Sequence, residues 1–173
     1  GRFNRWLCTG VNNGTSWKGG WTKDSEGPVD FACGVLLMIR RNVIDTVGMF
    51  DERFFMYFED VEFSRRVLRH FSIAYTPRGA AFHGSGGGKG WKNYTEVYLY
   101  HHTRNRQWTF ADDSRAYRMY VAGFTTLNAV AKSMVIIVAG MVRPRKAWSQ
   151  LSALWRGIQD GMRGSPVPRR SAT

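Results

Sequence analysis

FDERFFMYFEDVEF, residues 50–63, sets five carboxylates among aromatic rings. A solvated surface does not need so many aromatic side chains, and a hydrophobic core does not accommodate so many charges. Apolar rings that support carboxylates facing a ligand are typical of the wall of a cleft. This stretch therefore predicts a ligand-binding or catalytic site.

A helix is expected to begin at Glu59, because Val61, Ser64 and Leu68 recur at helical spacing. Glu59 and Asp60 would then lie in its first turn, where free backbone N–H groups and the helix dipole favour negative charge. Acidic residues at a helix start are ordinary caps, so the pair alone does not separate capping from catalysis. Capping does not explain the aromatic run that precedes the pair.

Composition and charge narrow the class of protein. A chain of 173 residues, 43% hydrophobic, is long enough for about one domain with a core. Two cysteines, Cys8 and Cys33, make neither a disulfide framework nor a metal knuckle, which indicates reduced thiols in a cytosolic setting. Most of the +12 net charge falls in residues 101–173, which carry 12 Lys or Arg and 3 Asp or Glu. Such a segment suits nucleic acid, anionic lipid or a polyanionic substrate, and charge alone does not choose among them.

The remaining patterns predict the order of elements. Residues 29–40, VDFACGVLLMIR, are mostly apolar and predict a buried strand. Residues 42–47 predict a short helix that ends at Gly48. We further expect a loop over residues 1–28, strands at 72–76 and 79–83, a mobile glycine-rich lid at 84–90, helices at 93–112, 115–142 and 148–162, and a disordered end at 165–173.

Residues 119–142 approach the length of a membrane span and contain one charged residue, Lys132. One helical face would carry Lys132 and two other polar side chains, and another would be apolar; the polar set is Thr125, Asn128 and Lys132, and the apolar set is Leu127, Val130, Ala131, Met134, Val138 and Met141. This division favours an amphipathic helix on a surface, and basic residues at both ends fit anionic lipid. Packing inside the protein and a true span stay open as alternatives.

Several pieces in this order resemble one enzyme family: VDFACGVLLMIRR, VGMFDERFFMYFEDVEFSRRV, FHGSGGG and YHHTRNRQW. Over residues 29–108 the chain resembles the C-terminal half of family 2 glycosyltransferases, especially the bacterial rhamnosyltransferase-like branch. The resemblance implies an α/β fold, here the C-terminal half of a GT-A domain with a mostly parallel sheet, at residues 1–112. A basic helical extension at 113–173 would follow it. The implied activity is transfer of a sugar from a nucleotide diphosphate to an acceptor hydroxyl, with inversion.

The resemblance also assigns roles to single residues. The family's acidic pair falls on Glu59 and Asp60, with Asp60 matching the general base. Gly34 matches the small residue beside the donor sugar and the acceptor, and the loop at 84–88 matches the segment that closes near the diphosphate. The downstream metal-ligand histidine falls on His83, which implies Mn²⁺ or Mg²⁺. Without the resemblance, a histidine at a strand end is more often bonded to backbone.

Substrate contacts and partners complete the expectation. We expect Trp91, Arg104 and Asn105 to bind substrate, although an arginine on a helix surface is equally common. The expected partners are a dTDP- or UDP-sugar, a glycan or lipid-linked acceptor, and a peripheral anionic membrane surface. Rhamnose on a cell-envelope glycan is the family-level expectation for the product, made by a cytoplasmic protein at the inner face of the membrane.

The chain also departs from the family. It shows no first βαβ unit for the nucleotide and no Asp-x-Asp metal motif after an apolar strand. We therefore expect a piece of a longer protein that is inactive alone. A basic nucleic-acid-binding module is the main alternative, but residues 50–63 would set five acids in its aromatic cluster, where they would repel phosphate. A membrane-docking fragment without catalysis is the second alternative, and in it Asp60 would be dispensable.

Overall fold

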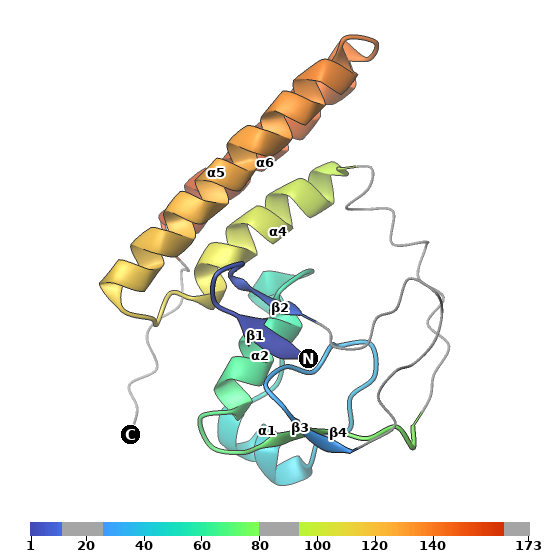
Figure 1. Cartoon of the computed structure of the whole chain (residues 1–173), viewed down its shortest axis with the longest axis vertical. Helices are drawn as coiled ribbons and strands as arrows, with labels where there is room; N and C mark the ends of the chain where they lie inside the picture. The colour runs from blue at the N-terminus through green and yellow to red at the C-terminus, as the bar shows by residue number, and fades with distance from the viewer. Residues whose placement is uncertain (12–25, 80–93, 165–173) are drawn as a thin grey trace. The chain divides into compact units, whose positions relative to one another are not determined.

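The computed structural model describes residues 1–11, 26–79 and 94–164. The chain forms two compact units, residues 1–89 and residues 90–173. We call them the N-terminal unit and the helical unit and describe each by itself (Figure 1). The expected division at residue 112 between a catalytic part and an extension stays a prediction.

The N-terminal unit is mixed α/β, as expected, but its strands are short and antiparallel. Its elements are β1 (Arg2–Asn4), β2 (Thr9–Val11), β3 (Gly27–Val29), α1 (Arg41–Val47), the 3₁₀ turn η1 (Glu52–Phe54), α2 (Glu59–Val67) and β4 (Ile73–Tyr75). Strand β1 pairs with β2, and β3 pairs with β4 with Pro28 opposite Ala74. The prediction of a mostly parallel sheet is wrong for the described residues, because each strand pair among them is antiparallel.

The buried strand predicted at residues 29–40 is also wrong. Regular pairing stops at Val29, and Leu36 is 58% exposed. A strand needs a neighbour to satisfy its backbone groups, and an apolar run does not supply one. Two backbone amides of this segment, at Ala32 and Gly34, instead donate to side chains of α2.

Other local predictions are confirmed. Helix α1 ends at Gly48, whose φ of 77° lies in the left-handed region that favours glycine. Helix α2 begins at Glu59, and β4 lies where a strand was expected at 72–76. The strands β1, β2 and β3 begin inside the predicted loop at 1–28. The predicted lid at 84–90, the end at 165–173 and all but the first residue of the strand at 79–83 lie outside the described residues.

Over residues 94–164 the helical unit contains three helices, close to those predicted: α4 (Glu96–Thr109), α5 (Arg115–Gly140) and α6 (Pro144–Met162). Thr95 and Ser114 cap α4 and α5 with their hydroxyls, and Pro144 opens α6, so each start has a local cause. Helices α5 and α6 form a long hairpin, and α4 packs on α6 and, less extensively, on α5 (Figure 1). Their core is made of Leu99, Ala129, Ile136, Ala147, Ala153, Leu154 and Ile158.

Helix α5 turns its polar face inward. Thr125 is buried, and the Lys132 ammonium lies 5.0 Å from the centre of the Tyr98 ring of α4. Burial, aided by the charge of Arg106, lowers the pKa of Lys132 to about 8. The apolar face named above is the exposed one, with Leu127 at 69%. By length and composition alone α5 could cross a membrane, and one such helix is weak evidence that it does.

The absence of a side chain at Gly157 allows α6 to pack closely against α4, and substitution of this residue tests that packing. A Cβ there would lie 2.7 Å from the carbonyl oxygen of Tyr100, whereas a Cβ at Gly123 on α5 would meet nothing within 4 Å. Gly157→Ala should lower the free energy of unfolding by about 1–2 kcal/mol, because overpacking exceeds the gain in helix propensity. Gly123→Ala should raise it by about 0.5–1 kcal/mol. Urea denaturation followed by circular dichroism measures both, and equal stabilisation by both would contradict this helix packing.

Candidate active site at the start of α2

The carboxylate of Asp60 is held in one orientation by two backbone amides. Its Oδ2 accepts a hydrogen bond from the Gly34 N–H at 3.0 Å, and its Oδ1 accepts from the Val61 N–H at 2.8 Å. A carboxylate has about four lone-pair positions, so each oxygen can accept a further bond. Asp60 is partly exposed. A ligand can therefore reach a carboxylate that is already oriented.

Gly34 leaves space beside this carboxylate. A Cβ at position 34 would lie 3.5 Å from the Asp60 Cβ and 3.8 Å from its Oδ2, which is ordinary van der Waals contact. Packing within the described residues therefore does not require glycine here. The residue is exposed, and its missing side chain opens room next to Asp60. The structure thus brings together two of the predicted site residues that are 26 positions apart.

Glu59 has a different environment from its neighbour. Burial raises the pKa of its carboxyl group, the charge of Asp60 raises it further, and a bond from its own backbone amide opposes both. Its Oε2 is buried and has no hydrogen-bond partner among the residues that the structure describes. A buried acceptor without a donor costs free energy, about 1–3 kcal/mol in mutational data. The pair therefore combines an oriented, accessible carboxylate with a partly desolvated one.

The aromatic run before the pair adopts unusual backbone angles. Phe55, Tyr57 and Phe58 have φ values of 58°, 67° and 70°, in the left-handed region that bulky residues rarely adopt. Each such residue costs roughly 1–3 kcal/mol and persists where packing enforces it. Phe54 and Phe58 are buried and supply that packing. These two buried rings thus anchor the strained turn that leads into Glu59, whereas Phe55 is 69% exposed.

Two further α2 residues support the site and were not predicted. The Ser64 hydroxyl accepts a hydrogen bond from the Ala32 N–H at 3.3 Å, one helical turn after Asp60. The Arg66 guanidinium donates to Glu62 at 2.6 Å and to the carbonyl of Met49 at 2.8 Å. These bonds tie α2 to the segment after β3 and to the end of α1. The four-residue spacing from Asp60 to Ser64 was a usable signal, but its partner was not visible in the sequence.

Asp51 caps the turn η1. It accepts from the Arg53 backbone N–H at 3.1 Å and from the Arg53 side chain. The Arg53 side chain is the largest cause of the lowered pKa of the Asp51 carboxyl group. This acid is therefore already engaged by a neighbouring cation.

Arg104 and Asn105 lie in the core of the helical unit. The Arg104 Nε donates to the Asn105 side-chain oxygen at 2.8 Å, and the guanidinium lies 4.1 Å from the Trp108 ring and 5.1 Å from the Tyr100 ring. Both residues are buried. These contacts give the pair a packing role, and substrate binding by it stays a prediction.

His83 and Trp91 lie outside the described residues. Within residues 1–11, 26–79 and 94–164, no group of three or more His, Cys, Asp or Glu side chains could hold a metal ion. The described part alone therefore does not make a metal centre, and His83 as a ligand stays a prediction.

The raised pKa of Glu59 predicts a pH-dependent cost of folding. An acid with a raised pKa binds its proton more tightly when folded, so stability falls as pH rises from the ordinary value of 4.5 through the raised value. Glu59→Gln removes this term. The variant's stability relative to the wild type should increase between pH 4 and pH 8, as measured by urea midpoints. Glu52→Gln on the exposed turn is the control, and a difference that does not change with pH would contradict the environment described for Glu59.

Comparison with known proteins adds partial matches to this geometry. No protein-family model matches the chain, and its comparison with solved structures gave no match. The N-acetylglucosaminyl-diphospho-decaprenol L-rhamnosyltransferase of Mycobacterium tuberculosis is 40% identical over 60 residues, which are 34% of this chain and 20% of that enzyme. A low-salt glycan biosynthesis hexosyltransferase of Haloferax volcanii is 45% identical over 42 residues, 24% of this chain and 14% of that enzyme. The chain thus spans well under two thirds of these relatives, and over the matched stretch it is related to glycosyltransferases.

Proposed function

We propose that this chain carries the acceptor side and the general base of an inverting glycosyltransferase. The observation that carries the proposal is the Asp60 carboxylate, which is oriented by the Gly34 and Val61 amides and partly exposed. The partial matches to a rhamnosyltransferase and a hexosyltransferase support the reaction class.

The proposed chemistry follows from the needs of the acceptor. A sugar hydroxyl is a poor nucleophile, so a carboxylate within hydrogen-bond reach takes its proton as the new glycosidic bond forms. Asp60 suits this role because the Gly34 and Val61 amides orient its carboxylate before substrate binds, which lowers the entropic cost of alignment. The hydroxyl oxygen attacks the anomeric carbon from the side opposite the diphosphate, which leaves with the electrons of the broken bond. One displacement of this kind inverts the configuration.

Glu59 and Gly34 have supporting roles in this proposal. Gly34 leaves room for the reacting sugar beside the base, and its amide keeps Asp60 pointing toward that room. Glu59 is partly desolvated and its Oε2 is buried, so its proposed role is to support the first turn of α2 beside the base and not to contact the substrate.

The donor and acceptor are proposed from the relatives. One relative acts, by its name, on a diphosphate-linked decaprenol, and both transfer hexoses or deoxyhexoses. We propose a dTDP- or UDP-sugar as donor, with rhamnose as the first sugar to test, and a lipid-linked glycan as acceptor. The donor-binding half is proposed to lie outside these 173 residues, so activity belongs to the full-length protein that contains them.

A divalent metal, Mn²⁺ or Mg²⁺, is part of the proposal through His83. When bound, the ion would neutralise charge on the departing diphosphate. The described residues do not by themselves provide a ligand cluster, so no step above is assigned to the ion. His83→Ala in the full-length protein should raise the metal concentration needed for half-maximal rate, and an unchanged requirement would remove His83 as a ligand.

Replacing the base is the main test. Asp60→Asn in the full-length protein should lower kcat by a factor of roughly 10²–10⁴, because the amide keeps the shape but cannot take the proton. Nucleotide diphosphate release from dTDP- and UDP-sugars measures the rate.

Asp45→Asn is the matched control, since Asp45 forms an exposed surface pair with Arg41 on α1 and such pairs contribute little. It should retain the wild-type rate. An Asp60→Asn protein that folds and keeps full activity would refute the assignment of the base.

A further inference from the structure

The exposed face of α5 forms one continuous apolar stripe, which we call the outer stripe. Its residues recur at helical spacing and are Leu127, Val130, Met134, Val138 and Met141. The polar side chains of α5 face the other way, with Thr125 buried and Lys132 over the Tyr98 ring. A helix that packs only within a water-soluble protein normally shows the opposite arrangement. This stripe therefore calls for an apolar environment outside the helical unit.

The turn between α5 and α6 adds exposed apolar and cationic side chains at one end of this stripe. Met141 and Val142 are 83% and 86% exposed, and Trp148 on the first turns of α6 is 75% exposed. Arg143 and Lys146 are exposed beside them. Apolar side chains, a tryptophan and cations together are typical of segments that enter the interface of a bilayer.

The charge of this region has one sign. Residues 114–159 contain seven Lys or Arg and no Asp or Glu. Among the described residues of the helical unit, Glu96 of α4 is the acid near the turn. It accepts a hydrogen bond from Ser149 at 2.6 Å, which is the largest cause of its lowered pKa, and the charge of Lys146 lowers that pKa further. One carboxylate does not balance the exposed cations of the turn. The turn is thus complementary to an anionic surface.

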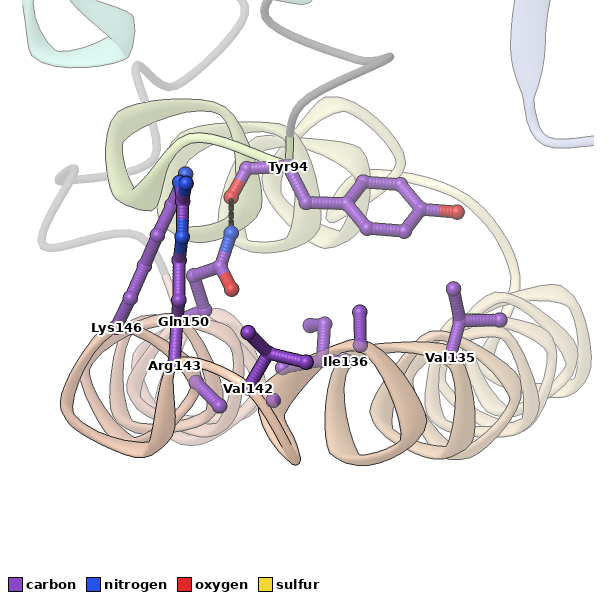
Figure 2. A pocket seen from close by; sticks show the side chains of 10 residues that line it. Tyr94, Val135, Ile136, Val142, Arg143, Lys146 and Gln150 are labelled. Atoms are coloured by element: carbon purple, nitrogen blue, oxygen red, sulfur yellow. Dashed lines mark hydrogen bonds between the residues drawn. The ribbon is translucent and has the colours of Figure 1, made fainter.

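A cavity of about 370 Å³ lies at the same end of the hairpin. Its floor is apolar, from Val135, Ile136 and Val142, and Arg143 and Lys146 stand side by side at its rim (Figure 2). Gln150 closes the wall through a 2.7 Å hydrogen bond to the carbonyl oxygen of Tyr94. Two parallel cations over an apolar floor suit a phosphate group attached to a hydrocarbon chain.

We propose that the end of the α5–α6 hairpin docks on an anionic phospholipid bilayer. Met141, Val142 and Trp148 enter the boundary between headgroups and acyl chains, and the adjoining part of the outer stripe lies along it. Arg143 and Lys146 bind lipid phosphates, one of them at the cavity. This inference concerns membrane attachment and does not depend on the transferase reaction proposed above.

The other helices indicate surface docking and not a span. Helix α6 runs beside α5 along the hairpin and carries Arg156 and Asp160, while α4 packs on both helices with Arg104 and Arg106 in its buried part. A bilayer crossed by α5 would surround these charged groups with hydrocarbon, at high cost. If the protein instead docks through the turn, these charged groups stay outside the hydrocarbon.

The experiment is sedimentation of the 173-residue chain with vesicles of phosphatidylcholine containing phosphatidylglycerol, and with pure phosphatidylcholine vesicles. The chain should bind the anionic vesicles, and added salt should weaken the binding. Arg143→Gln with Lys146→Gln should reduce the partition constant about 30-fold, from the usual contribution of each cation near a charged surface. Met141→Ser with Val142→Ser should also reduce it, and these exposed positions tolerate substitution without unfolding.

The matched control removes the same charge from the opposite end of α5, through Arg115→Gln with Arg118→Gln. These residues are exposed and lie roughly 33–38 Å from the turn along the helix. This pair should leave binding within about twofold of the wild type, and circular dichroism confirms that each variant is folded.

Four results would overturn the proposal. The first two are an equal loss of vesicle binding from both charge-pair variants and equal binding to pure phosphatidylcholine vesicles. The third is displacement of the protein from vesicles by millimolar glycerol phosphate, which would indicate a soluble phosphate ligand. The fourth is a concentration-dependent dimer through the outer stripe without vesicle binding.

Discussion

The hydrogen bond from the Gly34 amide to the Asp60 carboxylate is the contact on which the N-terminal unit depends. It joins a segment without regular pairing to the first turn of α2, and Ser64 repeats the same connection one helical turn later through Ala32. Side-chain oxygens of α2 thus serve as acceptors for amides that would otherwise belong to a sheet. Because the same bond fixes the carboxylate, local folding and the geometry of the candidate site share one cause.

The strained backbone and the buried unpaired oxygen in the described part of the N-terminal unit both lie close to this bond. The turn at Phe55, Tyr57 and Phe58 is held in costly backbone angles by buried rings, and Glu59 keeps a buried oxygen without a donor. Both features reduce stability, and both lie next to Asp60. Costs of this kind persist where a site needs a fixed geometry or a ligand restores the missing contact. In the helical unit, in contrast, side chains cap the starts of α4 and α5, and the unusual feature is an apolar face turned outward.

The sequence predicted the elements that have local causes and missed most of those that depend on distant partners, with β4, which pairs with β3, as the exception. Helices α4, α5 and α6 lie close to the ranges that periodicity predicted, and α2 begins at Glu59 as its carboxylates indicated. The strand at 29–40 failed because an apolar run does not contain its own pairing partner. Asp60 and Gly34 were selected by resemblance to a family, and only coordinates reveal the bond between them. Periodicity separated the polar face of α5 from its apolar face but did not predict which of the two packs inward.

The most direct measurement of the central claim is the pH dependence of the Gly34 amide signal in a ¹H–¹⁵N spectrum. If that N–H donates to Asp60, its proton shift should follow the ionisation of the Asp60 carboxyl group, with the same midpoint as the side-chain carbon. The response should vanish in Asp60→Asn. A Gly34 amide signal that does not change across the titration of Asp60 would show that the bond is absent, and the oriented base with it.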